Sequence, residues 1–352
     1  MSGEATQTSK MTGPLTIEIS SKGGWVRVPA VEVNGQVLVV NGKWLKAATV
    51  HDEEWMLEET SAPDLCVRTL KGQKSTGRRA DIFVFSQKLP NTAPKYPYPM
   101  EWQSVAAVEL KTFKEWWEKL PQETRKNVRR SEKRGVTVEV WPFSEGLIKG
   151  IQDVNNDSPM RQRIKNAHYG KTEEQIRKDY GAFLERSDFI VARAGDNVIG
   201  FLKIVYRGEV ASILNLTTKS SEYDKRPGNA LIAKAVELCE GRGAHFITYG
   251  QYNYGNKKDS PLREFKVRNG FDEVLVPRYY VPLNFWGTVC IRLKAHRGLL
   301  GVLPQPVIAA GLRARAGWYT LKQWLSRCSS MPERSNRNRQ MGCSNPPAGS
   351  NL

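Results

Sequence analysis

The stretch from Asp224 to Phe271 constrains the fold of this 352-residue chain most, because a glycine loop, a helix pattern, a strand pattern and a second helix follow one another there. Pro227 suits the first position of a helix, and Gly228 lets a ligand approach the backbone closely. Apolar residues recur at helical spacing until Gly241 and Gly243 end the pattern. We expect a helix whose free N–H groups and positive dipole end can hold a phosphate.

A short strand and a second helix come next. The run from His245 to Tyr249 is apolar, β-branched or aromatic, which is typical of a buried strand. Ser260-Pro261 begins the second helix and Asn269-Gly270 ends it. Alternating strand patterns also precede the glycine loop, at residues 189–194, 198–206 and 210–216. The order of elements predicts an α/β fold with a mixed, mostly antiparallel sheet flanked by helices.

This order, together with the loop Lys225-Arg226-Pro227-Gly228-Asn229-Ala230, resembles the acyl-CoA-binding core of the GNAT N-acyltransferase superfamily. That family places a [Gln/Arg]-x-x-Gly-x-[Gly/Ala] loop between a strand and a helix, and the amides of the loop hold the pyrophosphate of coenzyme A. Here a lysine stands at the first position. The resemblance implies an acyl-CoA co-substrate held by Lys225, Arg226, Gly228, Asn229 and Ala230.

The second helix resembles one branch of that superfamily. Many members carry an aromatic-Tyr pair shortly before Gly-Phe, whereas this chain has Phe265-Lys266 before Asn269-Gly270-Phe271. A Phe-Lys pair is similar to the Fem-type branch, whose members build peptidoglycan cross-bridges from aminoacyl-tRNA and contain two GNAT-like halves. The basic segment from Arg125 to Gly135 also resembles that branch. The resemblance implies two GNAT-like halves here, the first of them degenerate.

We therefore expect a disordered N-terminus over residues 1–13, a degenerate GNAT-like half over 14–140, an acyltransferase domain over 141–297 and a basic, partly disordered tail over 298–352. Asn34-Gly35 between apolar runs predicts a hairpin in the first half. We expect the segment from Trp286 to Leu293 to form the last strand of the sheet.

The chain is strongly basic, with 53 Lys and Arg against 36 Asp and Glu, a net charge of +17. Residues 292–352 hold ten of the basic residues and one acid, a net +9, which leaves 17 − 9 = +8 for the rest. Such charge favours anionic partners: a transfer RNA, a phosphorylated substrate or an anionic membrane. The tail could lie on the inner face of a membrane or pack on the domain.

The five cysteines are scattered and form no Cys-x-x-Cys pair, which argues against a disulfide framework and a zinc site. We expect no metal. The N-terminal residues lack the pattern of a secretion signal, and no apolar run is long enough to span a bilayer. These features favour the cytoplasm, with peripheral membrane contact as an option.

A basic helix is expected from Pro121 to Arg134. Arg125, Arg129 and Lys133 fall on one row of its surface at i, i+4 and i+8. The row could bind phosphates of RNA, of a nucleotide-linked acceptor or of coenzyme A, or it could be a solvated face. Arg161 and His168 follow in a polar stretch, and we expect both to belong to the substrate site. His168 could act as a base near neutral pH or make structural hydrogen bonds.

In the GNAT scheme an amine attacks the donor carbonyl directly, and the chain has neither a Gly-x-Ser-x-Gly elbow nor a Cys-His signature. The resemblance implies that Lys266 stabilises charge developing in the transition state and that Phe265 lines the substrate site. Alternatively, Lys266 could be an exposed lysine on the surface of the helix. Tyr249 and Tyr252 could donate a proton to the leaving group or line the core.

Three hypotheses remain open. The first is an N-acyltransferase that moves an acyl group from acyl-CoA to a primary amine. The second keeps the fold and uses aminoacyl-tRNA as donor, with the basic helix and tail gripping RNA. The third is a non-catalytic GNAT-like protein that binds nucleic acid or a membrane surface.

Overall fold

The structure is a computed structural model, and it describes residues 15–21, 24–52, 59–73, 77–161, 164–253 and 260–298. The chain divides into two units, Met1–Ile291 and Arg292–Leu352. The first unit contains the elements given below, apart from the final residue of α8 (Phe285–Arg292) and the short turn η3 (Ala295–Arg297), which belong to the second. The expected disordered N-terminus lies outside the described residues, as does the tail beyond residue 298.

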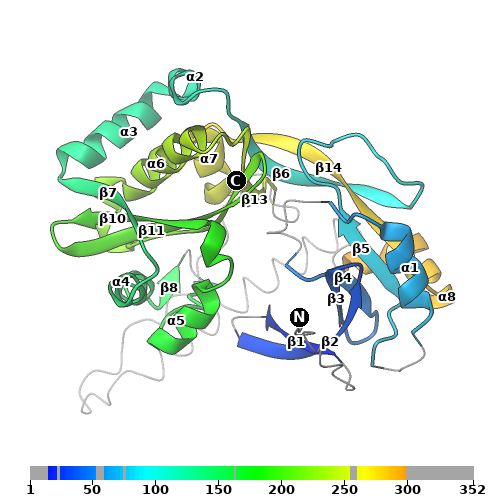
Figure 1. The fold of residues 1–352 in the computed structure, drawn as a ribbon. Helices are drawn as coiled ribbons and strands as arrows, with labels where there is room; N and C mark the ends of the chain where they lie inside the picture. Colours follow the sequence, from blue (N-terminus) through cyan, green and yellow to red (C-terminus); the bar gives the residue numbers. More distant parts are fainter. Residues whose placement is uncertain are drawn as a thin grey trace, which may run out of the picture. The chain divides into compact units, whose positions relative to one another are not determined.

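One large sheet organises the first unit (Figure 1). Its described strands lie in the order β1-β2-β3-β4-β5-β14-β6-β13-β12-β11-β10-β7. The sheet is mixed and mostly antiparallel, since only β4 with β5 and β12 with β13 pair in parallel. The predicted fold class is therefore confirmed. The strand bounds are β1 Thr16–Ser21, β2 Gly24–Val33, β3 Gln36–Asn41, β4 Ala47–Val50, β5 Ile82–Ser86, β6 Met100–Glu109, β7 Val136–Trp141, β10 Ser187–Ala194, β11 Asn197–Arg207, β12 Val210–Thr218, β13 Phe246–Gln251 and β14 Asp272–Pro282.

The strand order is pseudo-symmetric about its centre, because the strands of the second half match those of the first half in reverse order. In the first half, β1 to β4 form an antiparallel meander, and β5 returns parallel to β4. In the second half, β7, β10, β11 and β12 repeat the meander, and β13 returns parallel to β12. The halves exchange their last strands, because β14 pairs with β5 while β6 pairs with β13. The two GNAT-like halves are thus joined at β14 and β6, which pair with each other.

Helices cover both faces of the sheet (Figure 1). In the second half, α6 packs on one face over a core that includes Leu231, Ile247 and Phe271, and α4 and α5 cover the other face around Ile148 and Phe201. In the first half, α1 packs over the core around Phe83. The helices are α1 Pro63–Lys71, α2 Phe113–Lys119, α3 Gln122–Lys133, α4 Glu145–Asn155, α5 Glu173–Tyr180, α6 Pro227–Gly241, α7 Pro261–Arg268 and α8 Phe285–Arg292, with 3-10 turns η1 Leu184–Arg186, η2 Ser220–Lys225 and η3 Ala295–Arg297 and a small hairpin of β8 Met160–Arg161 and β9 Ile164–Lys165.

Local sequence explains many of these boundaries. Thr112 caps α2 by accepting a hydrogen bond from the Glu115 amide at 3.1 Å, and Thr172 and Gln175 form a capping box at the start of α5. Asn34 and its neighbouring glycine both have positive φ in the turn between β2 and β3, as the hairpin signal predicts. These elements follow directly from residue type.

The expected last strand over 286–293 is wrong, because that segment forms α8. Asn284 caps the helix by accepting a hydrogen bond from the Gly287 amide at 2.8 Å. A Cβ at Gly287 would lie 2.0 Å from the Asp81 carbonyl oxygen, so the glycine lets the helix pack against the start of β5. The aromatic and β-branched composition of the segment suggested a strand, but the asparagine cap and this close packing favour a helix.

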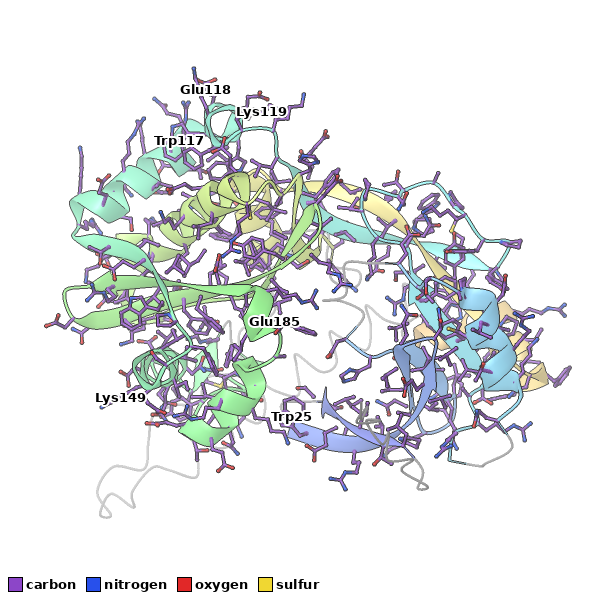
Figure 2. The ribbon with its side chains drawn as sticks, in the orientation of Figure 1. Trp25, Trp117, Glu118, Lys119, Lys149 and Glu185 are labelled. Atoms are coloured by element: carbon purple, nitrogen blue, oxygen red, sulfur yellow. The ribbon has the colours of Figure 1, made fainter. Side chains whose placement is uncertain are left out.

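A bridge also joins the first half to the second away from the shared strands (Figure 2). Trp25 on β2 donates its indole N–H to Asp179 on α5 at 3.0 Å. The ammonium of Lys178 lies 4.7 Å from the Trp25 ring centroid and 2.6 Å from the carboxylate of Glu18 on β1. The outer edge of the first half is therefore fixed to α5.

Candidate active site

The strands β12 and β13 diverge after a short parallel pairing. They are in register from Val210 with Phe246 to Ser212 with Thr248, but β12 continues to Thr218 without a further partner on β13 in that register. A bulge at Leu214 on β12 accompanies the divergence, since Ile213 and Asn215 have partners on β11 and the residue between them has none. The opening lies directly before the glycine loop that begins α6.

Lys266 lies at the other side of this opening. It is fully buried, with 0% of its surface exposed, although α7 otherwise presents charged residues to solvent. Its ammonium donates hydrogen bonds to the carbonyl oxygens of Tyr249 at 2.6 Å and Gln251 at 2.7 Å. These carbonyls flank a β-bulge at Tyr249 and Gly250, where Gly250 has a φ of 57°. The lysine thus fixes the bulge, and it is not the exposed surface residue that the sequence left as an alternative.

Burial lowers the pKa of Lys266 to about 8, because desolvation disfavours the ammonium form. The ammonium also lies 4.5 Å from the centroid of the Tyr249 ring, a favourable position for a cation. At pH 7 the lysine is therefore a cation held in an environment of low polarity, where its charge acts more strongly than it would in water.

A second buried lysine shows that burial alone does not identify a site. Lys203 on β11 donates hydrogen bonds to the carbonyl oxygens of Tyr180 at 2.7 Å and Ala182 at 2.5 Å, and burial lowers its pKa to about 8 as well. The carbonyl partners of Lys203 are not among the residues that line the cavity at the end of β13. Those of Lys266, in contrast, belong to residues that line it. The two lysines form a natural pair of test and control.

That cavity has a volume of about 340 Å³ and lies on the sheet face opposite α6, at the middle of the strand order. Its walls come from the ends of β5 and β13 and from the middle of β6, β12 and β14. Tyr249, Gly250 and Gln251 form one wall, and Arg278 lies at another. The bulge fixed by Lys266 is therefore part of the cavity wall.

The glycine loop has the conformation expected of a ligand-binding turn. Arg226 has a φ of 57°, which is uncommon for a residue with a side chain and often marks a functional turn. Pro227 is the first residue of α6, as predicted. A Cβ at Gly228 would lie 3.5 Å from the ring of Phe265, so this loop and the Phe265-Lys266 pair are neighbours. The structure thus brings together two predicted groups that lie far apart in the sequence.

The other predicted loop residues have internal partners. Lys225 pairs with the carboxylate of Glu222. The side-chain amide of Asn229 donates to Asn269 at 3.0 Å and thereby ties α6 to the end of α7. Ala230 is buried in the core. Of this set, Gly228 and the backbone around it are the groups best placed to face a ligand.

Two residues hold the loop in place: Asp157, which the sequence did not single out, and Arg134, which it indicated only as part of the basic helix. Asp157 accepts hydrogen bonds from the Ser220 amide and the Ser221 hydroxyl, both at 2.6 Å, at the start of η2. Arg134 donates to the carbonyl oxygen and the carboxylate of Asp224, both at 2.6 Å, near the end of η2. The loop is therefore braced from α4 and from α3. No local pattern signals these contacts, because they join segments distant in the sequence.

The predicted substrate-binding residues do not form one group. Arg125, Arg129 and Lys133 lie on α3, on the face of the sheet that α6 covers (Figure 1). Arg161 and His168 belong to the opposite face near α4 and α5, where Arg161 donates to the Val154 carbonyl oxygen at 2.8 Å and His168 lies 3.8 Å from the carboxylate of Asp179. These last two contacts fit the structural alternative.

His168 and Tyr252 have surroundings that limit their chemistry. Desolvation and the nearby Lys171 lower the pKa of His168, against the opposing charge of Asp179. Tyr252 is buried against the core of the second half, and the guanidinium of Arg263 lies 5.0 Å from its ring centroid.

Among the described residues no set of His, Cys, Asp and Glu is arranged to hold a metal ion. None of the described helices has the length and apolar character needed to cross a membrane.

Comparison with known proteins identifies the fold. No protein-family model matches the chain, and no curated protein matches its sequence. Among solved structures, FemX superposes with a TM-score of 0.50 at 12% identity, over 76% of this chain and 89% of FemX. L-PGS from Bacillus licheniformis gives 0.48 at 15% identity, over 76% and 86%, and a tandem GNAT protein from the clavulanic acid biosynthesis pathway gives 0.42 at 9%, over 74% and 82%.

The similarity to FemX concerns the fold alone. The predicted resemblance to the Fem-type branch is confirmed at that level. The chain has the GNAT-like fold of the Fem-type acyltransferases.

Proposed function

We propose that this protein is an acyltransferase that moves an acyl group from acyl-CoA to a primary amine by direct attack. One observation carries the proposal: the buried ammonium of Lys266 holds the bulged end of β13, which opens away from β12 beside the glycine loop and forms the wall of a cavity. A donor bound through its phosphates at Gly228 on the α6 side could pass its acyl group between the two strands toward the cavity on the other face.

The transfer step takes place between the amine and the thioester, without a covalent intermediate on the protein. The amine nitrogen attacks the acyl carbon, the C–N bond forms, and the C–S bond of the thioester breaks. The proton released by the amine ends on the thiolate, so the reaction closes with an amide and coenzyme A thiol. Negative charge develops on the carbonyl oxygen and then on the sulfur, and the buried ammonium of Lys266, behind the cavity wall at Tyr249 and Gln251, would stabilise both through its positive charge. One preorganised group of this kind typically contributes about 10²–10³ in rate.

The remaining residues have supporting roles in this scheme. The N–H groups at the start of α6 bind the donor phosphates. Phe265 packs against Gly228 and keeps the loop next to the lysine. Tyr249 presents its carbonyl to Lys266 and its ring to the core, so its main contribution is to the shape of the bulge. Tyr252 is placed to support that wall from within the core.

A second donor, aminoacyl-tRNA, is favoured by the position of the basic helix. Several cationic residues of α3, among them Arg129 and Lys133, are exposed. The helix is attached to the donor loop through Arg134 and Asp224, and to α7 through the Thr124 hydroxyl, which donates to the Arg268 carbonyl oxygen at 2.9 Å. A row of cations beside the phosphate-binding turn suits a polyanionic donor.

A panel of acyl-CoA thioesters with a mixture of amines tests the proposal through release of the free thiol. The wild type and Lys203→Met should release thiol with at least one donor, and Lys266→Met should not. Coenzyme A should raise the melting temperature if it is the donor carrier. Salt-dependent binding of tRNA without any response to coenzyme A would select the second donor instead. A lack of response to both would leave the non-catalytic hypothesis.

A further inference from the structure

A cluster of polar side chains from three neighbouring strands lies in the wall of the cavity. Arg278 on β14 donates hydrogen bonds from Nη1 to the Ser86 hydroxyl at 3.1 Å and to Gln103 Oε1 at 3.4 Å. Ser86 on β5 donates to the same Gln103 oxygen at 2.9 Å. Because the three groups hold one another across β5, β14 and β6, the guanidinium has a fixed position before any ligand binds.

The charges around the cavity favour an anion. Arg278 and Lys88 are both lining residues, and the described lining includes no aspartate or glutamate, although Glu101 lies opposite Arg278 on β6. Among the described residues the side-chain amide nitrogen of Gln103 donates no hydrogen bond, whereas its oxygen accepts from two donors. A guanidinium beside an amide N–H offers only donors, which matches a carboxylate, an acceptor-only group.

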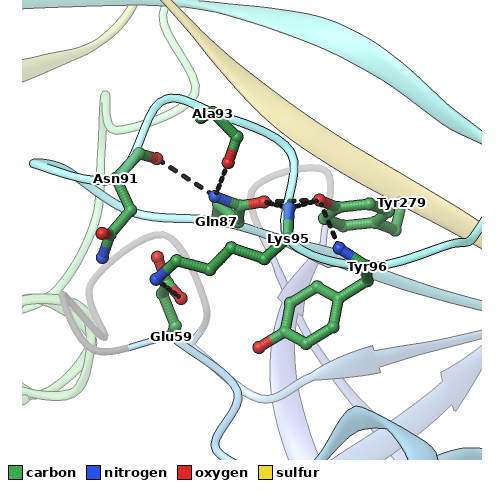
Figure 3. A network of polar contacts seen from close by, with 7 residues as sticks. All are labelled: Glu59, Gln87, Asn91, Ala93, Lys95, Tyr96 and Tyr279. Atoms are coloured by element: carbon green, nitrogen blue, oxygen red, sulfur yellow. Dashed lines mark hydrogen bonds and ion pairs between the residues drawn. The ribbon is translucent and has the colours of Figure 1, made fainter.

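The segment that carries Lys88 is fixed by a network around Gln87 (Figure 3). The buried side chain of Gln87 accepts a hydrogen bond from the Lys95 amide at 2.9 Å and donates to the Ala93 carbonyl oxygen at 2.8 Å. The hydroxyl of Tyr279, next to Arg278, also donates to Gln87. These hydrogen bonds therefore fix the position of this wall of the cavity.

The distance from Arg278 to the bulge sets the size of the ligand. The strand β6 lies between β14 and β13, with Arg278 opposite Glu101 and Gln251 opposite Val105. At about 4.8 Å between strands and about 3.4 Å per residue, the backbones at Arg278 and Gln251 are about 17 Å apart, and the arginine side chain covers part of that distance. A volume of about 340 Å³ is at the small end of ligand pockets. The cavity fits a short molecule and not a folded partner.

We propose that this cavity binds the acceptor, and that Arg278 with Gln103 recognises a carboxylate on that acceptor, several bonds from its reactive amine. The acceptor is then an amino acid with a long side chain or spacer, or a short peptide with a free C-terminus. This assignment rests on the proposed acyl transfer, because it places the amine at the bulge fixed by Lys266 and the carboxylate at the far wall.

Binding of matched ligand pairs tests the assignment without any donor. Triglycine and triglycinamide differ in the terminal charge, as do 6-aminohexanoate and 6-aminohexanamide, while each pair keeps its amine. Dissociation constants are measured by ligand-observed NMR on the full chain. We expect at least one carboxylate to bind about tenfold more tightly than its amide, because the neutral amide forms no charge-assisted hydrogen bond with the guanidinium.

Variants show which group is responsible. Arg278→Met should remove the preference, Arg278→Lys should keep part of it, and Arg27→Gln, on the exposed side of β2, should keep it in full. If Arg278→Met fails to fold, Gln103→Met provides the second variant and should weaken the preference. A wild type that binds no carboxylate more tightly than its amide overturns the assignment. If Lys266 is nevertheless required for thiol release, the proposed acyl transfer stands without it.

Discussion

The ammonium of Lys266 donates a 2.6 Å hydrogen bond to the carbonyl oxygen of Tyr249 and lies 4.5 Å from the centroid of the same tyrosine's ring. One residue of α7 thus holds both the backbone and the side chain of the bulged end of β13. Since that strand forms the wall of the cavity, the lysine can influence chemistry there through its charge and through the shape of the wall.

The first prediction concerns stability and pH. Burial lowers the pKa of Lys266 to about 8 in the folded protein, whereas an unfolded lysine holds its proton to above about pH 10. Between these values the unfolded state binds more protons, so the free energy of unfolding rises with pH. The difference between wild type and Lys266→Met should grow by about 2 kcal/mol in favour of wild type from pH 7 to 10.

Urea unfolding at a series of pH values checks this. Lys203→Met provides a matched control, because burial also lowers the pKa of Lys203 to about 8. We expect the free energy of unfolding of wild type relative to Lys203→Met to rise with pH by the same amount. The pH profile therefore depends on burial of a lysine and not on a role in the site. A pH-independent difference for Lys266→Met would mean that this lysine has an ordinary pKa and is exposed in solution.

The second prediction separates donor binding from folding at the glycine loop. Gly228→Ala introduces a methyl group at an ordinary contact distance of 3.5 Å from Phe265, and the backbone there is not left-handed. Stability should stay within about 0.5 kcal/mol of wild type or rise slightly, while the KM for the donor should rise roughly tenfold, because the methyl group occupies the path of the phosphates.

Gly241→Ala in the same helix is the control, since a Cβ there meets no atom within 4 Å. It should change neither the KM for the donor nor the folding of the helix. An unchanged KM in Gly228→Ala would show that the donor phosphates do not approach this turn.

Much of this region is predictable from sequence, and the reason is local. The ends of α6 and α7 follow proline, glycine and asparagine signals, and the hairpin of β10 and β11 follows its alternation. The bulge at Gly250 was not predicted, because the strand pattern ends at Tyr249 whereas the strand continues to Gln251.

Other features depend on contacts between distant segments. The exchange of β6 and β14 between the halves joins residues more than a hundred positions apart, and no period in the sequence reports it. The cluster of Arg278, Ser86 and Gln103 exists only because of that exchange. For the same reason α8 was predicted as a strand, since its packing against Asp81 has no local signature.

The third prediction concerns Asp157 as a positioning residue for the donor loop. Burial raises the pKa of this carboxyl group, but hydrogen bonds from Ser221 and Ser220, together with the charge of Arg161, outweigh burial and leave the pKa lowered. Its stabilising contribution is present above the unfolded pKa of about 4 and is lost as pH falls through the lower folded value. Asp157→Asn should cost about 1 kcal/mol at pH 7 and less at pH 3.

The same variant should raise the KM for the donor and leave kcat nearly unchanged, because in the proposed function the loop holds the donor phosphates and touches no reacting atom. Asp153→Asn, at an exposed position of α4, which ends just before Asp157, should alter neither quantity. A fall in kcat at constant KM would assign Asp157 a different role.

The fourth prediction concerns the bridge between the halves. Trp25→Leu removes the indole hydrogen bond to Asp179 and the cation contact with Lys178, so it should destabilise the fold by about 1 kcal/mol. Hydrogen exchange should increase in β1 and β2. Trp102→Leu, at a half-exposed position of β6, should leave the exchange of β1 and β2 as it is in wild type, whereas equal effects of both variants would argue against a bridge.

The most direct test of the whole account is the rate of acyl transfer by Lys266→Met, measured with the donor and amine that the thiol-release panel identifies, next to the donor dissociation constant. We predict a fall in rate of about 10²–10³ with a dissociation constant within about threefold of wild type, and near-normal transfer by Lys203→Met. Transfer by Lys266→Met at the wild-type rate would contradict the account.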